Sequence, residues 1–190
     1  MEGIILAAGK GTRMKSDLPK VVHEVAEKPM VLRVYEALIG AGVKRVVAVV
    51  GYRKEKVEEI LSGRAVIAVQ EEQLGTGHAA LVAMPYIEDD NVIIVAGDTP
   101  LLKASTLQAL IKKHLETGAY ATVLTCFLSN PYGYGRIVRD GYGKILKIVE
   151  EKDATIEEKQ IAEVNTGIYC FKTKILKEIL PLLKAENAQK

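Results

Sequence analysis

Short apolar runs alternate along the chain with amphipathic stretches of helical length. The apolar runs are rich in Val, Ile and Ala and predict strands at Gly3–Ala7, Arg45–Val50, Ala65–Val69, Val92–Ala96 and Ala121–Phe127. The amphipathic stretches predict helices at Met30–Ala41, Lys54–Leu61, Thr76–Met84 and Ser105–Thr117. This alternation is typical of βα units around a mostly parallel sheet, so we predict an α/β fold. The continuous apolarity of the runs indicates strands covered on both faces.

The pattern changes after residue 127. Turn-rich segments at residues 130–135 and 140–143 alternate with strand-like runs at Lys144–Val149 and Val164–Phe171, and a last helix is predicted at Lys174–Leu183. Turns alternating with strands favour a smaller antiparallel subdomain. We therefore predict two halves, residues 1–127 and residues 128–190.

Composition narrows the classes of protein that fit. Of 190 residues, 48% are hydrophobic and 26% charged, which is ordinary for a globular chain and excludes a disordered one. The net charge of +2 favours neither nucleic acid nor a membrane as partner, so any anionic ligand must be held by a local cluster. With no long apolar run and no signal sequence, we expect a cytoplasmic protein. Cys126 and Cys170 lie in apolar runs and are expected to be buried rather than disulfide-bonded.

A glycine-rich turn, Leu-Ala-Ala-Gly-Lys-Gly-Thr-Arg-Met at residues 6–14, follows the first predicted strand. Small residues let backbone amides approach phosphate oxygens, while Lys10 and Arg13 supply charge. Open α/β sheets bind ligands at this end of a strand. The turn is not a P-loop, which needs Gly where Ile4 stands, nor a dinucleotide fingerprint, which needs Gly where Met14 stands. A tight βα turn with incidental basic residues remains an alternative.

Three further polar positions follow predicted turns or strands. Lys20 comes after Pro19 and could clamp phosphates, although an exposed lysine is more often only a solvated charge. Gln70 offers both a donor and an acceptor to the edge of a pyrimidine base. Asp98 emerges from a buried strand and is a candidate Mg²⁺ ligand if phosphates supply the rest, or else a cap or turn residue.

One glycine and two histidines are the remaining candidates for a functional role. Gly75 would let backbone approach a planar ring at the start of the helix that opens at Thr76. We interpret His78 as a hydrogen-bonded orienting residue. His114 falls on the apolar face of its helix, which favours an edge-of-core or solvent position over catalysis.

In this order the segments resemble the uridyltransferase (pyrophosphorylase) domain of the bacterial bifunctional N-acetylglucosamine-1-phosphate uridyltransferase/glucosamine-1-phosphate acetyltransferase family. The glycine-rich turn with Lys20 is shared by many sugar nucleotidyltransferases. More specific spellings are Gln-Leu-Gly-Thr-Gly-His-Ala from residue 73, Gly-Tyr-Gly-Arg from 133, Val-Glu-Glu-Lys-Asp-Ala from 149 and Asn-Thr-Gly-Ile from 165. The resemblance implies a Rossmann-like, glycosyltransferase A-like nucleotidyltransferase fold with a sugar-binding antiparallel part.

The resemblance also implies roles for individual residues. Leu6, Ala7, Ala8 and Gly9 would hold the nucleotide, with Gln70, Gly75 and Thr76 reading uracil and Asp98 binding Mg²⁺. Gly135, Glu150 and Asn165 would bind the N-acetylglucosamine moiety, and Arg13 and Lys20 would face phosphates as catalytic residues. Ala96 stands where the family often has an aromatic residue.

The implied reaction joins UTP and N-acetylglucosamine 1-phosphate into UDP-N-acetylglucosamine and pyrophosphate, which would serve cell-wall peptidoglycan and lipopolysaccharide synthesis. A second metal-binding Asn of the family lies past position 190, so the chain looks truncated and its own activity is left open. The resemblance implies a trimer for the full-length protein and leaves the oligomeric state of this chain open. Alternatives are another sugar-1-phosphate nucleotidyltransferase of the same fold, or a non-catalytic module that binds nucleotide sugars.

Overall fold

The computed structural model describes residues 1–11 and 14–183, which form two compact units. The first consists of Met1–Thr122 with Tyr169–Leu183, and the second consists of Val123–Ile168. The sequence pattern predicted a single division of the chain, at residue 127. The structure differs because the chain returns to the first unit at Tyr169, where the end of a long strand and the helix after it complete that unit.

Most of the regular structure belongs to the first unit. Its elements, in chain order, are β1 (Glu2–Ala7), η2 (Lys20–Val22), β2 (Glu24–Val25), β3 (Lys28–Pro29), α1 (Met30–Gly40), β4 (Val46–Val50), α2 (Lys54–Leu61), β5 (Val66–Val69), α3 (Thr76–Ala83), η3 (Met84–Tyr86), β6 (Asn91–Ala96), α4 (Ala104–Thr117), α6 (Thr173–Ile179) and η4 (Leu180–Leu182). Two strands, β7 (Ala121–Phe127) and β10 (Glu163–Lys172), belong to both units. The alternation of strands and helices confirms the predicted α/β class.

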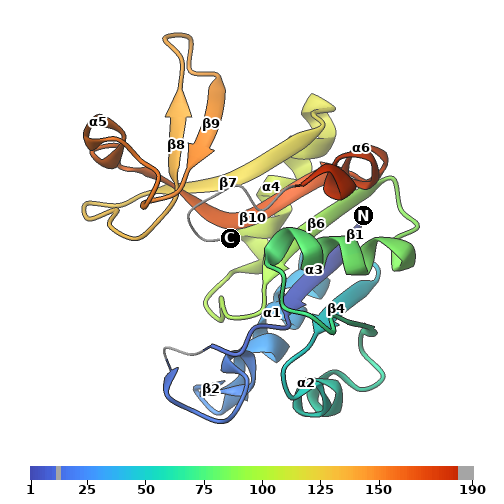
Figure 1. The fold of residues 1–190 in the computed structure, drawn as a ribbon. Helices are drawn as coiled ribbons and strands as arrows, with labels where there is room; N and C mark the ends of the chain where they lie inside the picture. Colours follow the sequence, from blue (N-terminus) through green and yellow to red (C-terminus); the bar gives the residue numbers. More distant parts are fainter. Residues whose placement is uncertain (12–13, 184–190) are drawn as a thin grey trace. The chain divides into compact units, whose positions relative to one another are not determined.

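The sheet of the first unit has the strand order β5-β4-β1-β6-β10 (Figure 1). The first four strands are parallel, whereas the end of β10 pairs antiparallel with β6. Leu6 of β1 is paired with Val49 on one side and Ala96 on the other. The carboxyl ends of β1, β4 and β6 therefore meet at one edge of the sheet, where open α/β sheets bind ligands.

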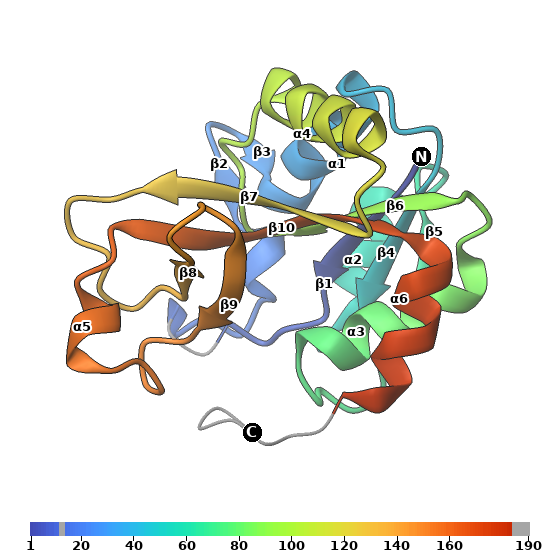
Figure 2. The same ribbon diagram turned by 90° about the horizontal axis from the view of Figure 1, so that it is seen from above.

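Helices cover both faces of this sheet, which is why its strands are apolar throughout. In Figure 2, α1 and α4 lie on one face and α3 and α6 on the other. Every residue of β4 is buried, as expected for a strand with two covered faces. Each fully buried Val or Ile side chain contributes on the order of 1.5–3 kcal/mol relative to an exposed one. Within the described residues, no helix is long and apolar enough to cross a membrane.

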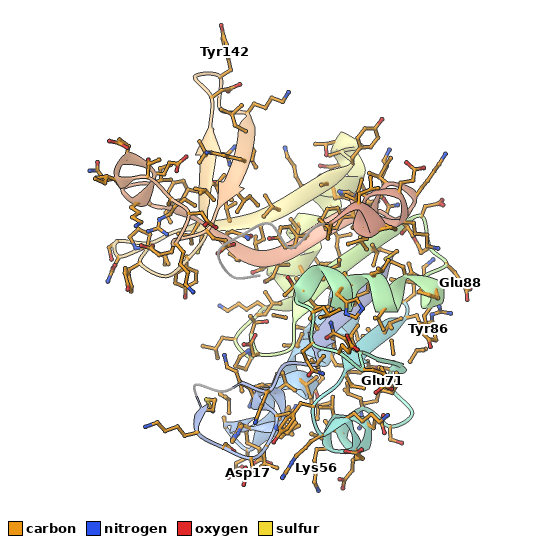
Figure 3. All side chains as sticks on the ribbon, viewed as in Figure 1. Asp17, Lys56, Glu71, Tyr86, Glu88 and Tyr142 are labelled. Carbon is orange, nitrogen blue, oxygen red and sulfur yellow. The ribbon has the colours of Figure 1, made fainter. Side chains whose placement is uncertain are left out.

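The second unit is antiparallel, as the change in pattern after residue 127 predicted. Its strand β8 (Arg136–Arg139) pairs with β9 (Ile145–Val149) on one side and with β10 on the other, and a short helix α5 (Ile156–Lys159) follows. The carboxylate of Asp140 accepts hydrogen bonds from the amides of Tyr142 and Lys144, which closes the β8–β9 turn. Figure 3 shows Tyr142 at the tip of this turn, where its side chain is fully exposed.

Most element predictions are confirmed to within one or two residues, but three details are wrong. Strand β7 is not covered on both faces, because Phe127 is 75% exposed and Cys126 is exposed as well. Cys126 was expected to be buried and is exposed. The last helix ends at Ile179 and continues as the 3-10 turn η4, since Pro181 cannot donate the next helical hydrogen bond. Cys170 is buried as expected, and burial raises the pKa of its thiol to about 12.

Candidate functional site

The glycine-rich turn leaves the carboxyl end of β1 and is tied to both neighbouring strands. The amide of Gly97, just past β6, donates to Leu6 O at 2.9 Å. The amide of Tyr52, just past β4, donates to Ala8 O at 3.2 Å. At Gly51 an added Cβ would lie 3.0 Å from Ala8 O. The backbone of the turn is thus held in place on both sides by residues that leave the same edge of the sheet.

Gly11 places the turn directly against Lys20. Its φ of +67° is in the left-handed region that favours glycine, and a Cβ added there would lie only 2.6 Å from Lys20 Cβ. Lys20 begins η2 after Pro19, and its Nζ donates to Asp98 Oδ2 at 2.6 Å. The turn therefore packs against Lys20, the predicted phosphate-binding residue, and Lys20 in turn binds Asp98, the predicted metal ligand.

Asp98 lies just beyond the carboxyl end of β6. The preceding residue, Gly97, packs so closely that an added Cβ would be 3.2 Å from Leu6 O. Asp98 does not cap α4, which begins six residues later at Ala104 after an N-cap at Lys103. In the part of the chain that the structure describes, no group of three or more His, Cys, Asp and Glu side chains could hold a metal ion.

Gln70 forms a buried wall of the same site. It follows β5, is 3% exposed, and its amide donates to Val50 O at 2.8 Å. Its side-chain nitrogen Nε2 donates to Gly75 O at 3.2 Å and lies 2.9 Å from His78 Nδ1. Since Gly75 O can only accept, the carboxamide nitrogen must face it and the carboxamide oxygen points the other way. This contact confirms that His78 is hydrogen-bonded, and its role in orienting Gln70 stays a prediction.

Gly75 ends the loop that carries Gln70 towards α3. Its φ is +95° with ψ near 180°, a backbone conformation that non-glycine residues rarely adopt. Helix α3 starts at the next residue, Thr76, as predicted. The glycine thus allows the chain to turn sharply into the helix while its carbonyl anchors the Gln70 side chain.

These segments line one cavity of about 320 Å³. Its walls are formed by Leu6, Ala7, Ala8, Gly9, Gly11, Lys20, Val21, Gln70, Gln73, Gly75, Thr76, Ala79, Ala96 and Asp98. The residues predicted to bind the nucleotide or the metal line this cavity, with two exceptions. Lys10 is not in the lining, and its Nζ lies 5.2 Å from the centre of the Tyr52 ring. Arg13 lies outside the described residues. Gln73 also lines the cavity, although no role was predicted for it; it is the first residue of the Gln-Leu-Gly-Thr-Gly-His-Ala segment. Its Nε2 donates to Gln70 O at 3.3 Å.

The three residues predicted to bind the sugar lie together in the second unit. The Asn165 amide donates to Gly135 O at 2.8 Å, and Asn165 Oδ1 accepts from the Gly167 amide. An added Cβ at Gly135 would lie 3.1 Å from Glu150 Oε1. Strand pairing explains this, because Arg136 is opposite Val149 and Val164, so each predicted residue is one step beyond these partners.

A buried ion pair beside this cluster was not predicted. Arg136 is 1% exposed, and its Nη2 donates to Glu151 Oε2 at 2.7 Å. Both residues occur in the two family-specific spellings around residues 133 and 149, yet nothing in the sequence alone joined them. Arg136 and the Gly133 amide, which also donates to the carboxylate, hold the pKa of Glu151 below its usual range.

His114 is part of the core and not of the cavity. It is 1% exposed, and its ring nitrogens contact Thr122 Oγ1 at 2.9 Å and Asn91 Oδ1 at 3.2 Å. Burial, with a smaller contribution from the charge on Lys172, lowers the pKa of His114. The expected position at the edge of the core or in solvent is therefore wrong, because His114 is fully buried.

Known proteins of similar sequence are longer than this chain. Over 190 residues it is 96% identical to the bifunctional protein GlmU of Carboxydothermus hydrogenoformans. The match covers all of this chain and 43% of that protein. It is 52% identical over 189 residues to the bifunctional protein GlmU of Clostridioides difficile, covering 99% of this chain and 41% of the relative. The chain thus spans less than half the length of these relatives.

Structural and family comparisons give the same assignment of fold. A crystal structure of a Bacillus anthracis protein, assigned provisionally as a glucose-1-phosphate thymidylyltransferase and solved with a sucrose, superposes with a TM-score of 0.81 at 21% identity. The match covers all of this chain and 78% of that one. The family model of the MobA-like NTP transferase domain matches residues 3–186. The chain therefore belongs to the family of MobA-like NTP transferase domains.

Proposed function

We propose that this chain is the uridyltransferase part of a GlmU-type enzyme, and that it couples UTP to N-acetylglucosamine 1-phosphate. The observation that carries the proposal is the meeting of the glycine-rich turn, Lys20 and Asp98 in one cavity, with Lys20 Nζ 2.6 Å from Asp98 Oδ2. Its high identity to GlmU proteins supports the choice of nucleotide and sugar. The product would supply amino sugar for cell-wall synthesis.

The cavity suits a nucleotide that lies across the edge of the sheet. Because the nitrogen of the Gln70 carboxamide is bound to Gly75 O, its oxygen is available to accept from the N3–H group of uracil. Thr76 and Gly75 would contact the other side of the ring. The triphosphate would then lie along Ala8 and Gly9, where an added Cβ at Gly9 meets no atom within 4 Å.

The residues present fit a Mg²⁺ ion that is completed by substrate. The Asp98 side chain is 32% exposed and lines the cavity, so one carboxylate faces the space in which phosphates would lie. Mg²⁺ is commonly held by one or two carboxylates together with substrate phosphates and water. When bound, it would neutralise charge on the triphosphate.

The reaction needs no general base from the protein. A phosphate oxygen of the sugar 1-phosphate, already ionised at neutral pH, attacks the α-phosphorus of UTP. A new P–O bond forms as the bond to the β-phosphate oxygen breaks and pyrophosphate leaves. Lys20, and Arg13 by the family resemblance, would offset the growing negative charge, and positioning of two anions would supply most of the catalysis.

Gly135, Glu150 and Asn165 are proposed to bind the N-acetylglucosamine moiety in the second unit. Glu150 offers a carboxylate and Asn165 a carboxamide, and both can hydrogen-bond sugar hydroxyl groups. The absence of a side chain at Gly135 leaves the space that the Glu150 carboxylate occupies.

An assay of pyrophosphate release tests this function. The chain would be compared with a version extended by the remaining residues of the Carboxydothermus hydrogenoformans relative, using a panel of nucleoside triphosphates and sugar 1-phosphates. We expect the extended chain to prefer UTP with N-acetylglucosamine 1-phosphate and to require Mg²⁺. A preference for glucose 1-phosphate or for another triphosphate would show a different transferase, and nucleotide-sugar binding without turnover would show a binding module.

A further inference from the structure

The Arg136–Glu151 ion pair lies directly behind two residues of the proposed sugar site. Gly135 precedes Arg136 in the chain, and Glu150 precedes Glu151. Successive side chains along a strand point to opposite sides, so a residue next to a ligand contact can reach the layer behind it. Arg136 is 1% exposed, which places its guanidinium in that covered layer.

The pair fastens together three segments that surround Gly135. Arg136 Nη2 donates to Glu151 Oε2 at 2.7 Å and to Lys159 O, at the end of α5, at 3.3 Å. Arg136 Nη1 also donates to Tyr134 O. On the other side, the Gly133 amide donates to the same Glu151 oxygen at 3.1 Å. The turn at residues 133–135 is therefore fixed from both directions.

We propose that Arg136 and Glu151 are positioning residues that set the affinity for the sugar phosphate by holding the Gly135 backbone and the Glu150 carboxylate in place. This inference rests on the proposed function. Gly135 and Glu150 lie one residue beyond the paired Arg136 and Val149, and Glu150 is past the end of β9. Their carbonyl oxygens accept from the amides of Asn165 and Asp153, but these backbone bonds do not hold the Glu150 carboxylate. The charged hydrogen bonds between Arg136 and Glu151 therefore fix the backbone beyond the last paired residues of β8 and β9.

A second ion pair in the same unit provides a matched control. Arg139 binds Glu163 through two hydrogen bonds of 2.7 Å each, from Nε and from Nη2. Glu163 also accepts from Thr125 Oγ1 at 2.8 Å. This pair is as short as the first, but it contacts neither the turn at residues 133–135 nor Glu150.

The test compares Glu151→Gln and Arg136→Lys with Glu163→Gln in the extended chain. We expect the first two variants to raise KM for N-acetylglucosamine 1-phosphate on the order of tenfold, because small misplacements of binding groups are costly. KM for UTP should stay within about twofold, since Gln70 and the glycine-rich turn are untouched. Glu163→Gln should lower the unfolding temperature without changing either KM.

The possible results distinguish a failure of this positioning role from a failure of the proposed function. If the unsubstituted extended chain turns over normally and neither variant changes KM for the sugar phosphate, the positioning role is wrong. An equal rise in KM for Glu163→Gln would also overturn it, because a general loss of stability would then explain the effect. An unsubstituted chain that fails to use N-acetylglucosamine 1-phosphate overturns the proposed function first. Should Glu151→Gln not fold, Arg136→Lys decides, with calorimetric binding of UDP-N-acetylglucosamine as a second readout.

Discussion

A single methyl group at Gly11 should separate the role of the glycine-rich turn in binding from its role in stability. In Gly11→Ala the new Cβ would lie 2.6 Å from Lys20 Cβ, whereas carbon atoms in good contact are roughly 3.5–4.0 Å apart. Either the turn or Lys20 must move by about 1 Å to relieve this overlap. Lys20 would then lose its position beside Asp98.

The matched control is Gly63→Ala. Gly63 has the same φ of +67°, but no atom lies within 4 Å of a Cβ added there. Both variants place alanine in a left-handed conformation, at a cost of about 1–2 kcal/mol. Only Gly11→Ala adds overpacking, at about 1–3 kcal/mol if the neighbours cannot relax. The difference between the variants therefore isolates the contact with Lys20.

Urea unfolding and calorimetric titration with UTP in the presence of Mg²⁺ measure the two effects. We expect Gly63→Ala to bind UTP normally. Gly11→Ala should bind about ten- to a hundredfold more weakly, since losing one hydrogen bond to a charged phosphate costs about 1.5–3 kcal/mol. If both variants have equal stability and equal UTP affinity, then the close packing of Gly11 on Lys20 has no role in the site.

Three further predictions concern other parts of the site and the second unit. Asp98→Asn should abolish Mg²⁺-dependent pyrophosphate release in the extended chain while leaving the unfolding temperature nearly unchanged, and activity at low Mg²⁺ would exclude the metal role. Gln70→Leu should weaken UTP binding on the order of tenfold or more but change the affinity for inorganic triphosphate little, because only the contact with the base is lost. Equal losses of affinity for both ligands in a competition assay would refute the base contact. The hydrogen bonds from Arg139 lower the pKa of Glu163, so its contribution to stability is present above the ordinary glutamate pKa and is lost as pH falls through its lowered value in the folded state. Acid titration followed by circular dichroism should therefore show the stability difference between wild type and Glu163→Gln shrinking below about pH 4, and a constant difference would contradict the reasoning.

The first unit could be predicted well because its sequence repeats one physical pattern. Runs such as Val46–Val50 are apolar at every position, which is typical of a strand covered on both faces. The carboxyl ends of parallel strands share an edge, so Gly97 and Asp98 could be expected near the turn after β1. What could not be predicted was the 2.6 Å contact between Lys20 and Asp98, since the residues between β1 and η2 follow no periodic pattern.

The second unit was predicted less completely because β8 and β9 are short and most of β9 is exposed. In β9 four of five residues are exposed, so the apolar residues of this strand do not indicate burial. Strand β8 was missed because only four residues, two of them arginines, form it. The pairing of Arg136 with Glu151 depends on which residues the hairpin brings together, and no local signal encodes that partner.

The most direct test of the central claim locates the nucleotide and its metal by NMR. Mn²⁺ with UTP would be added to the isotopically labelled chain, with Mg²⁺ and UTP as the diamagnetic reference. Paramagnetic broadening should centre on the amides of Ala8, Gly9 and Asp98. The structure offers a second cavity at the opposite edge of the sheet. It is lined by Glu88 (labelled in Figure 3), Asp89 and Asp90 before the start of β6, and by residues of α6. Broadening centred there, with the turn unaffected, would contradict the account.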